Sequence, residues 1–195
     1  MIKLLDKGNQ VWITKSNNDK RKLQYTLQII EVDKIKFCVN THITNKIIQE
    51  ALEKKLINNF RDYDLIRPEK KFGKNTRFDF LLYNKKNKKK SFLEVKSVSL
   101  MRKKGHAEFP DSVTTRGKKH LESLMIAHKQ GYESHLIFLI QIEKCKSFGI
   151  ASDIDPGYYD LLKIALKKNV KVLCYDCKFS NKGIEINKEI NFLND

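Results

Sequence analysis

Short apolar runs separated by polar loops occupy the first 40 residues, a pattern typical of β-strands. The runs lie at Gln10–Thr14, Leu23–Val32 and Lys36–Asn40, and the loop from Lys15 to Lys22 is polar and basic. Basic loops on short strands suit a small barrel that follows a phosphate backbone. Three strands are too few to close a barrel, so we predict an incomplete β-barrel domain over residues 1–40.

Helical and strand-like periods alternate over residues 41–195. Apolar residues recur at helical spacing in Thr44–Ile57, where Thr44 or Asn45 is the expected cap, and in Thr115–Gln130. Apolar runs predict strands at Leu65–Phe72, Ala107–Phe109, Ser134–Ile142 and Val170–Cys174. The alternation predicts a second, α/β domain over residues 41–195.

A third helix is predicted to begin at Pro156. Aspartate is a preferred N-cap residue and proline a preferred first helical residue, and Asp155 and Pro156 stand in that order. Capping therefore explains Asp155 without any chemical role.

The segment from Arg77 to Val98 has the pattern of a β-hairpin around the lysine-rich turn Asn84–Lys90. The period of two places Glu94 and Lys96 on one face of the return strand, Phe92–Val98. If the turn is centred between Lys86 and Asn87, Asp79 lies directly opposite Glu94. On the first strand, the alternation places Phe78, Phe80 and Leu82 on one face. It places Arg77, Asp79 and Leu81 on the other.

Asp79, Glu94 and Lys96 are the candidate catalytic residues. Two carboxylates facing each other across a ladder destabilise it unless a cation lies between them. Mg²⁺ prefers such oxygens, keeps several waters and takes phosphate as a further ligand. Lys96 would then position an attacking water or offset the charge of a phosphate. The alternative is a half-exposed hairpin with scattered charges, because an isolated E-x-K triplet is common by chance.

Three side chains on the predicted helices are further candidates. Glu50 lies at the border of an apolar stripe, where it would either reach the metal or remain solvated. Arg116 and His120 are four residues apart on one helix flank, so they would contact a phosphate or serve surface packing. His128 lies in the apolar stripe of the same helix and is interpreted as a core residue.

The charge of the chain favours a polyanionic partner. Thirty-nine Lys and Arg against 23 Asp and Glu leave a formal charge of +16 over 195 residues. Because lysine is abundant throughout, a merely lysine-rich surface is the alternative. A hydrophobic content of 41% is ordinary for a folded protein, and an aromatic content of 10% argues against disorder.

The sequence predicts a cytoplasmic protein with reduced thiols. No apolar run approaches the roughly 20 residues that span a membrane, and residues 1–8 have no apolar signal core. Cys174 and Cys177 lie in a strand-like run, where positions three apart point to opposite faces. No second pair stands at zinc-ligand spacing, so packed free cysteines are predicted.

Several motifs occur together in an order that is far more specific than any one of them. They are Asn17–Thr26, Asn40–Thr41, Arg77–Phe80, Glu94–Val98, Phe109–Thr114, Arg116–Leu121 and Asp155–Tyr158. On these residues the whole chain resembles the sugar fermentation stimulation protein A family. Family members usually carry further strands before the segment similar to Leu4–Gly8, so the resemblance implies a shortened N-terminal domain.

The resemblance implies an OB-like barrel, partial here, followed by a restriction-endonuclease-like α/β domain with a mixed-sheet core of the PD-(D/E)xK type. Asp79, Glu94 and Lys96 match the nuclease-type core motif, and Glu50 lies on the helix that often adds an acid. The implied cofactor is Mg²⁺ or Mn²⁺, with Asp79, Glu94 and Glu50 as metal ligands. Asp111 falls on a family motif without an assigned role.

The family is associated with sequence-nonspecific DNA binding and with regulation of sugar use, notably maltose genes. The candidate nucleic-acid contacts are Arg21, Lys22, Arg77, Arg116, Lys119 and His120. The predicted function is therefore a DNA-binding protein on a metal-dependent nuclease fold. A non-catalytic DNA-binding regulator with a vestigial metal site is the main alternative, and RNA processing is a third.

Overall fold

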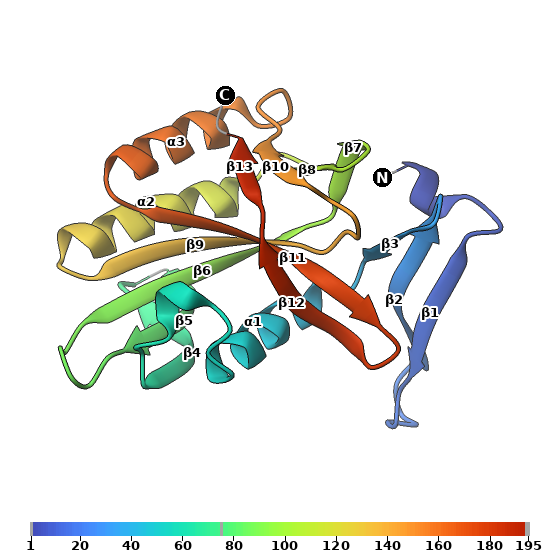
Figure 1. Ribbon diagram of the computed structural model, residues 1–195, viewed down its shortest axis with the longest axis horizontal. Coiled ribbons are helices and arrows are strands. Elements are labelled where there is room, and N and C mark those ends of the chain that lie inside the picture. Colours follow the sequence, from blue (N-terminus) through green and yellow to red (C-terminus); the bar gives the residue numbers. More distant parts are fainter. Residues whose placement is uncertain (1, 75, 194–195) are drawn as a thin grey trace.

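The computed structural model describes residues 2–74 and 76–193 (Figure 1). The chain begins with a 3-10 turn at Ile2–Leu5 and a three-stranded antiparallel sheet in the order β1-β2-β3. Its strands are β1 (Gln10–Lys15), β2 (Tyr25–Val32) and β3 (Ile35–Cys38), which confirms the three predicted strands to within two residues at every end.

A six-stranded mixed sheet in the order β12-β11-β9-β6-β5-β4 forms the centre of the rest of the chain. Strand β6 pairs parallel with β9 and antiparallel with β5, so the predicted hairpin lies beside the buried centre of the sheet. Its strands are β4 (Leu65–Phe72), β5 (Thr76–Tyr83), β6 (Lys90–Val98), β9 (Glu133–Ile140), β11 (Lys171–Ser180) and β12 (Gly183–Glu189).

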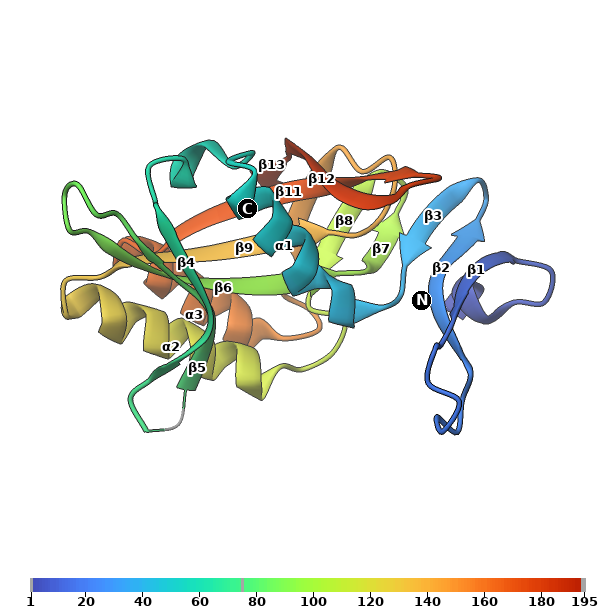
Figure 2. The same cartoon turned by 90° about the horizontal axis from the view of Figure 1, so that it is seen from below.

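Helices cover both faces of this sheet. Helix α1 (Thr44–Glu53) packs on one face, and α2 (Thr115–Lys129) and α3 (Pro156–Lys167) pack on the other (Figures 1 and 2). Asp155 caps α3 by accepting a hydrogen bond from the Tyr158 N–H, as predicted. The two helix layers around a mixed sheet confirm the α/β architecture.

A second, smaller sheet has the order β13-β10-β8-β7, and the sequence predicted little of it. Only β8 was expected, because the other strands are short and have no clear alternation. The four strands are β7 (Leu100–Lys103), β8 (His106–Phe109), β10 (Ser147–Ile150) and β13 (Asn191–Leu193). Strand β12, in the large sheet, was missed as well.

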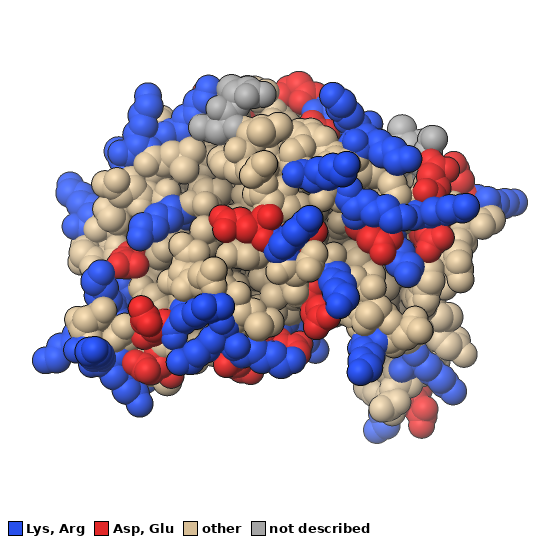
Figure 3. All heavy atoms as spheres, viewed as in Figure 1, with Lys and Arg blue, Asp and Glu red and all other residues tan. Residues whose placement is uncertain are grey.

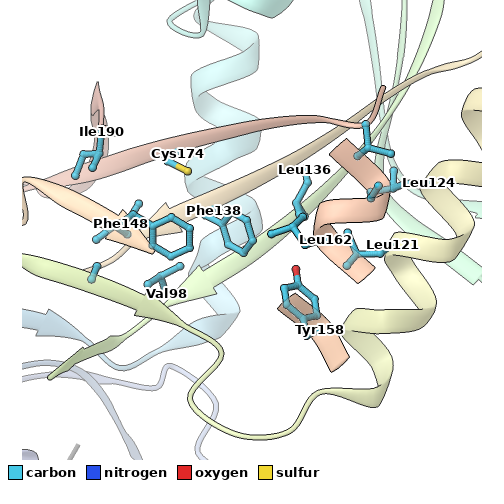
Figure 4. Packing of buried hydrophobic residues seen from close by; sticks show 14 of the residues in the cluster. Val98, Leu121, Leu124, Leu136, Phe138, Phe148, Tyr158, Leu162, Cys174 and Ile190 are labelled. Carbon is cyan, nitrogen blue, oxygen red and sulfur yellow. The ribbon is translucent and has the colours of Figure 1, made fainter. Parts of the chain in front are cut away.

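The core divides into two clusters, one on each face of the large sheet. Phe138 and Leu136 of β9 pack with Leu121 of α2 and Leu162 of α3 on one face (Figure 4). Cys174 lies in this cluster, whereas Cys177 lies in the α1 cluster on the other face. Both thiols are buried and free, as predicted for packed cysteines.

Two local predictions on α1 and β5 were wrong. Helix α1 has no side-chain cap, because Thr44 and Asn45 direct their polar groups to Gln141 and Asp79 instead. Phe78 packs in the α2–α3 cluster rather than beside Phe80. The β4–β5 ladder is distorted between these two residues, where Glu69 adopts a φ of 51°.

The fully buried amide of Gln141 joins the two parts of the chain. Its Oε1 accepts hydrogen bonds from the hydroxyls of Thr44, at 2.7 Å, and Ser97, at 2.5 Å. Its backbone carbonyl accepts from the Cys38 N–H at 2.9 Å. These bonds tie β3, the start of α1 and the end of β6 together, next to the predicted catalytic residues Glu94 and Lys96 of β6.

Among the described residues, no helix is long and apolar enough to cross a membrane.

Candidate metal-binding and catalytic site

A hollow of about 530 Å³ lies where the first turns of α1 and α2 meet strands β4, β5 and β6. We call it the acidic pocket. Its lining includes Asn45, Lys46, Gln49, Pro68, Glu69, Asp79, Glu94, Val95, Lys96 and Arg116. The three predicted catalytic residues therefore share one hollow, which two helices and three strands hold in place.

The hairpin register brings the two acids together. Phe80 pairs with Leu93, so the next position along the hairpin sets Asp79 beside Glu94, as the turn length predicted. Both oxygens of Asp79 are held: Oδ2 accepts the Val95 N–H at 2.7 Å, and Oδ1 accepts the Asn45 side-chain amide at 2.7 Å. The carboxylate consequently has a fixed orientation at the pocket wall.

Glu94 is 2% exposed and makes contact with two basic side chains. Lys96 Nζ lies 2.7 Å from Glu94 Oε1, which confirms that the two side chains share a face of β6. His120 Nδ1 bonds to the same oxygen. An ionised carboxylate only accepts hydrogen bonds, so we assign the Nδ1 proton to this bond. Lys96 Nζ also approaches Nδ1, at 3.2 Å.

The two carboxylates have opposite pKa shifts. Burial raises the pKa of Asp79, and the nearby charge of Glu94 raises it further, against the opposing hydrogen bonds from Val95 and Asn45. Burial alone would raise the pKa of Glu94 as well. The hydrogen bond with His120 and the charge of Lys96 outweigh that effect and lower it. Glu94 is therefore the more firmly ionised of the two acids.

The donor set fits a hard divalent cation. Glu94 Oε2 is buried and has no hydrogen-bond partner among the described residues, so one carboxylate oxygen is left for a ligand. Mg²⁺ binds through one or two protein carboxylates and completes its shell with water and phosphate oxygens. Asp79 and Glu94 supply two such carboxylates. In the described part of the chain, no three His, Cys, Asp or Glu side chains form a full cage.

Glu50 does not line the acidic pocket; it forms an ion pair with Lys54, and its side chain is 53% exposed. Helix α1 lines the pocket with Thr44, Asn45, Lys46 and Gln49. Glu50 lies one residue beyond them, with its side chain directed to Lys54 outside the hollow. The structure thus places this expected metal ligand outside the site.

The candidate nucleic-acid contacts are dispersed. Arg116 is exposed and lines the acidic pocket, and Arg77 pairs with the pocket residue Glu69 at 2.8 Å. His120 is buried against Glu94 and Lys96 rather than displayed on the surface. The remaining candidates are exposed and lie outside the pocket lining: Arg21, Lys22, Lys119 and the motif residue Asp111.

Asn45 contacts a catalytic candidate, although the sequence predicted it as a helix cap. Its amide donates to Asp79 across 34 residues of sequence. The signal in the sequence was the four-residue spacing of Asn45 and Gln49, which places both on one polar face of the helix. A capping role alone does not require such a face.

Comparison with known proteins supports one family assignment for the whole chain. The model described as "Sugar fermentation stimulation protein RE domain" matches residues 42–183, and that of the "SfsA N-terminal OB domain" matches residues 1–40. The sugar fermentation stimulation protein homolog of Pelagibacter ubique is 50% identical over 191 residues, covering 98% of this chain and 82% of the relative. The homolog of Pseudoalteromonas atlantica is 40% identical over 192 residues, covering 97% and 81%.

A solved structure gives the same architecture. The SfsA protein of Pyrococcus furiosus, determined in complex with Ca²⁺, superposes with a TM-score of 0.87 at 23% identity, covering 99% of this chain and 81% of that one. This similarity establishes the fold, an OB domain followed by a mixed α/β domain, and the sequence matches establish the family. The chain belongs to the sugar fermentation stimulation protein family.

Proposed function

We propose that this protein is a DNA-binding phosphodiester hydrolase that uses Mg²⁺ or Mn²⁺ held by Asp79 and Glu94. The observation that carries the proposal is the buried Glu94 carboxylate. One of its oxygens is paired with Lys96 and His120, and the other has no partner among the described residues. Burying a charged group is costly unless it is paired or coordinates a metal, so a cation at this oxygen accounts for its position.

A bound divalent cation would polarise the phosphoryl oxygen and lower the pKa of a water molecule. The protein side chains supply the remaining functions. Asn45 and the Val95 N–H hold Asp79 in one orientation, and the Val95 carbonyl is a further candidate ligand. Glu94 holds Lys96, which positions the attacking water or offsets charge on the phosphate, and His120 holds Glu94. Arg116 at the rim contacts the phosphate backbone.

Two further observations support the proposal. The solved Pyrococcus furiosus protein is a complex with Ca²⁺, which binds oxygen ligands as Mg²⁺ does. The charge of +16 favours a polyanionic substrate in the cytoplasm and supplies sequence-independent affinity for DNA.

The same charge also favours the second candidate function, a non-catalytic DNA-binding regulator of sugar-use genes. Nonspecific binding requires only Lys and Arg side chains that neutralise phosphates. The two functions differ in whether Glu94 acts on bound nucleic acid.

The test is incubation of purified protein with plasmid, single-stranded DNA and RNA, with Mg²⁺, with Mn²⁺ or with EDTA. We expect metal-dependent cleavage that Glu94→Ala abolishes, while salt-sensitive DNA binding persists. Glu50→Ala is the matched control, because it removes an exposed acid outside the acidic pocket and should leave cleavage unchanged. Cleavage that survives Glu94→Ala would assign the activity to another site or a contaminant. An absence of cleavage on every substrate would leave the binding regulator.

A further inference from the structure

A second hollow, of about 600 Å³, lies on the same edge of the large sheet. Strands β4, β5 and β6 and the segment after α2 line it. We call it the aromatic groove and define it by the aromatic residues Phe72, Tyr83, Phe92 and Tyr132 and by the basic residues that flank them. None of these residues belongs to the site described above.

The floor of the aromatic groove consists of rings that contact one another. Phe92 lies 4.9 Å from Tyr132 and 5.1 Å from Phe72, measured between ring centroids. Phe92 is buried, whereas Phe72, Tyr83 and Tyr132 are half-buried and so retain exposed ring surface. Rings fixed by packing offer a stacking surface at little cost in conformational entropy.

Four exposed cations surround these rings: Arg67, Lys70, Lys71 and Lys90. Lys90 Nζ lies 6.0 Å from the centroid of the Tyr83 ring. The lining residues include no Asp or Glu, and none of the four cations forms an ion pair within the described ranges. The groove therefore combines unneutralised positive charge with aromatic surface, which is the combination that single-stranded nucleic acid requires.

Strand β4 is the edge strand of the sheet (Figures 1 and 2) and contributes residues to both the aromatic groove and the acidic pocket. Pro68 and Glu69 line the acidic pocket, and their neighbours Arg67 and Lys70 line the groove. Successive residues of a strand point to opposite faces, so Arg67 and Pro68 line the two hollows from opposite faces of one short stretch of β4. A strand of nucleic acid that passes around this edge strand would contact both hollows.

On these grounds we propose that the aromatic groove binds the unpaired bases of single-stranded nucleic acid while a neighbouring phosphodiester occupies the acidic pocket. The proposal rests on the proposed function for its choice of polymer and narrows that polymer to a single strand. A duplex keeps its bases paired and stacked inside, so it offers the groove phosphates but no free base faces.

The test measures equilibrium binding in EDTA, by fluorescence anisotropy, with three labelled probes of equal length. The probes are a 12-nucleotide single-stranded DNA, an abasic strand with the same phosphates, and a duplex. We expect the single strand to bind at least about tenfold more tightly than the abasic strand, because stacking contributes about 1–3 kcal/mol per base. Tyr132→Leu, which keeps an apolar side chain, should reduce that preference.

A pair of charge reversals isolates the role of the groove. Lys70→Glu with Lys71→Glu should weaken single-strand binding at least about tenfold, because phosphate contacts carry a large share of the affinity. Lys103→Glu with Lys104→Glu is the matched control: two adjacent, exposed lysines on and after β7, far from β4 in Figure 1. The control should lose no more than about threefold through the change in overall charge.

The outcomes separate this proposal from the proposed function. Equal binding of the single strand and the abasic strand, or equal losses in both double variants, would overturn the aromatic groove as a base-binding site. Metal-dependent cleavage would stand in that case. Groove-dependent binding without any cleavage would overturn the hydrolase and keep the single-strand site.

Discussion

The acidic pocket and the aromatic groove are similar in size, share strand β4 and carry basic side chains at their rims, yet their floors differ. The buried carboxylate of Glu94 and the half-buried one of Asp79 form the floor of the pocket, and rings form that of the groove. On the face that Figure 3 shows, Lys and Arg side chains are spread widely, with acids interspersed. Total charge is a ground for the proposed polyanionic partner but locates no chemistry. The side chains on the floors of the two hollows distinguish them.

Asp79→Asn should give the largest difference between the effect on cleavage, which we assign to the acidic pocket, and the effect on single-strand binding, which we assign to the aromatic groove. The change keeps an oxygen for the Val95 N–H but removes the charge that holds the cation. Cleavage should fall about 1,000-fold, because a metal contributes several kcal/mol and about 1.4 kcal/mol is a factor of ten in rate. Single-strand binding in EDTA should stay within about twofold, measured on the same preparation. If cleavage and single-strand binding fell by the same factor, the two hollows would not have separate roles.

Lys96→Met should lower the cleavage rate about 100-fold, the scale for removing one group that stabilises developing charge. The apolar side chain keeps the length of the stem and removes only the ammonium group beside Glu94. Single-turnover kinetics separate this loss from binding. A change in substrate affinity with an unchanged rate at saturation would assign Lys96 to binding instead.

Asn45→Ala should weaken Mn²⁺ binding about tenfold, the lower end of the effect of losing a group that orients a metal ligand. Asn45 donates to Asp79, whereas its neighbour on the same face, Gln49, donates to Glu53. Gln49→Ala is therefore the matched control and should bind Mn²⁺ as the unmodified protein does. Equal effects of the two substitutions would show that Asn45 does not act through Asp79.

Acidification should affect the acidic pocket before the aromatic groove. Burial beside Glu94 raises the pKa of Asp79, so Asp79 takes up a proton at a higher pH than an ordinary aspartate and then binds the cation poorly. Because the pKa of Glu94 is lowered, Asp79 is the acid that limits binding. Mn²⁺ affinity should therefore fall over a pH interval that lies above the one in which an ordinary aspartate titrates.

Single-strand binding in EDTA should change little over the same pH interval, since no Asp, Glu or His lines the groove. If single-strand affinity fell with pH as Mn²⁺ affinity does, the two hollows would not act independently.

Local patterns predicted the parts of the site that depend on one hairpin. The position of the turn Asn84–Lys90 fixes which residues of the two strands lie opposite each other. The sequence therefore predicted that Asp79 and Glu94 are neighbours. The period of two placed Lys96 beside Glu94. Asp155 followed equally from local capping chemistry.

Features that depend on tertiary packing were not predictable. The rotation of α1 decides that Asn45 rather than Glu50 faces the pocket, and that rotation is set by contacts with the sheet. Phe78 changes faces because of a distortion that involves Glu69 on the neighbouring strand. The groove joins Phe72 of β4 to Tyr132 after α2, and no local pattern connects residues so far apart.

The central claim is that Asp79 and Glu94 hold a divalent cation. Isothermal titration calorimetry of Mn²⁺ into the protein without nucleic acid tests it directly, with Asp79→Asn and Glu94→Ala beside Glu50→Ala as the control. We predict one site per chain, unchanged in Glu50→Ala and at least about 100-fold weaker in the other two variants, because each loses a charged ligand. Equal Mn²⁺ binding in all four proteins, or none in the unmodified protein, would contradict the account.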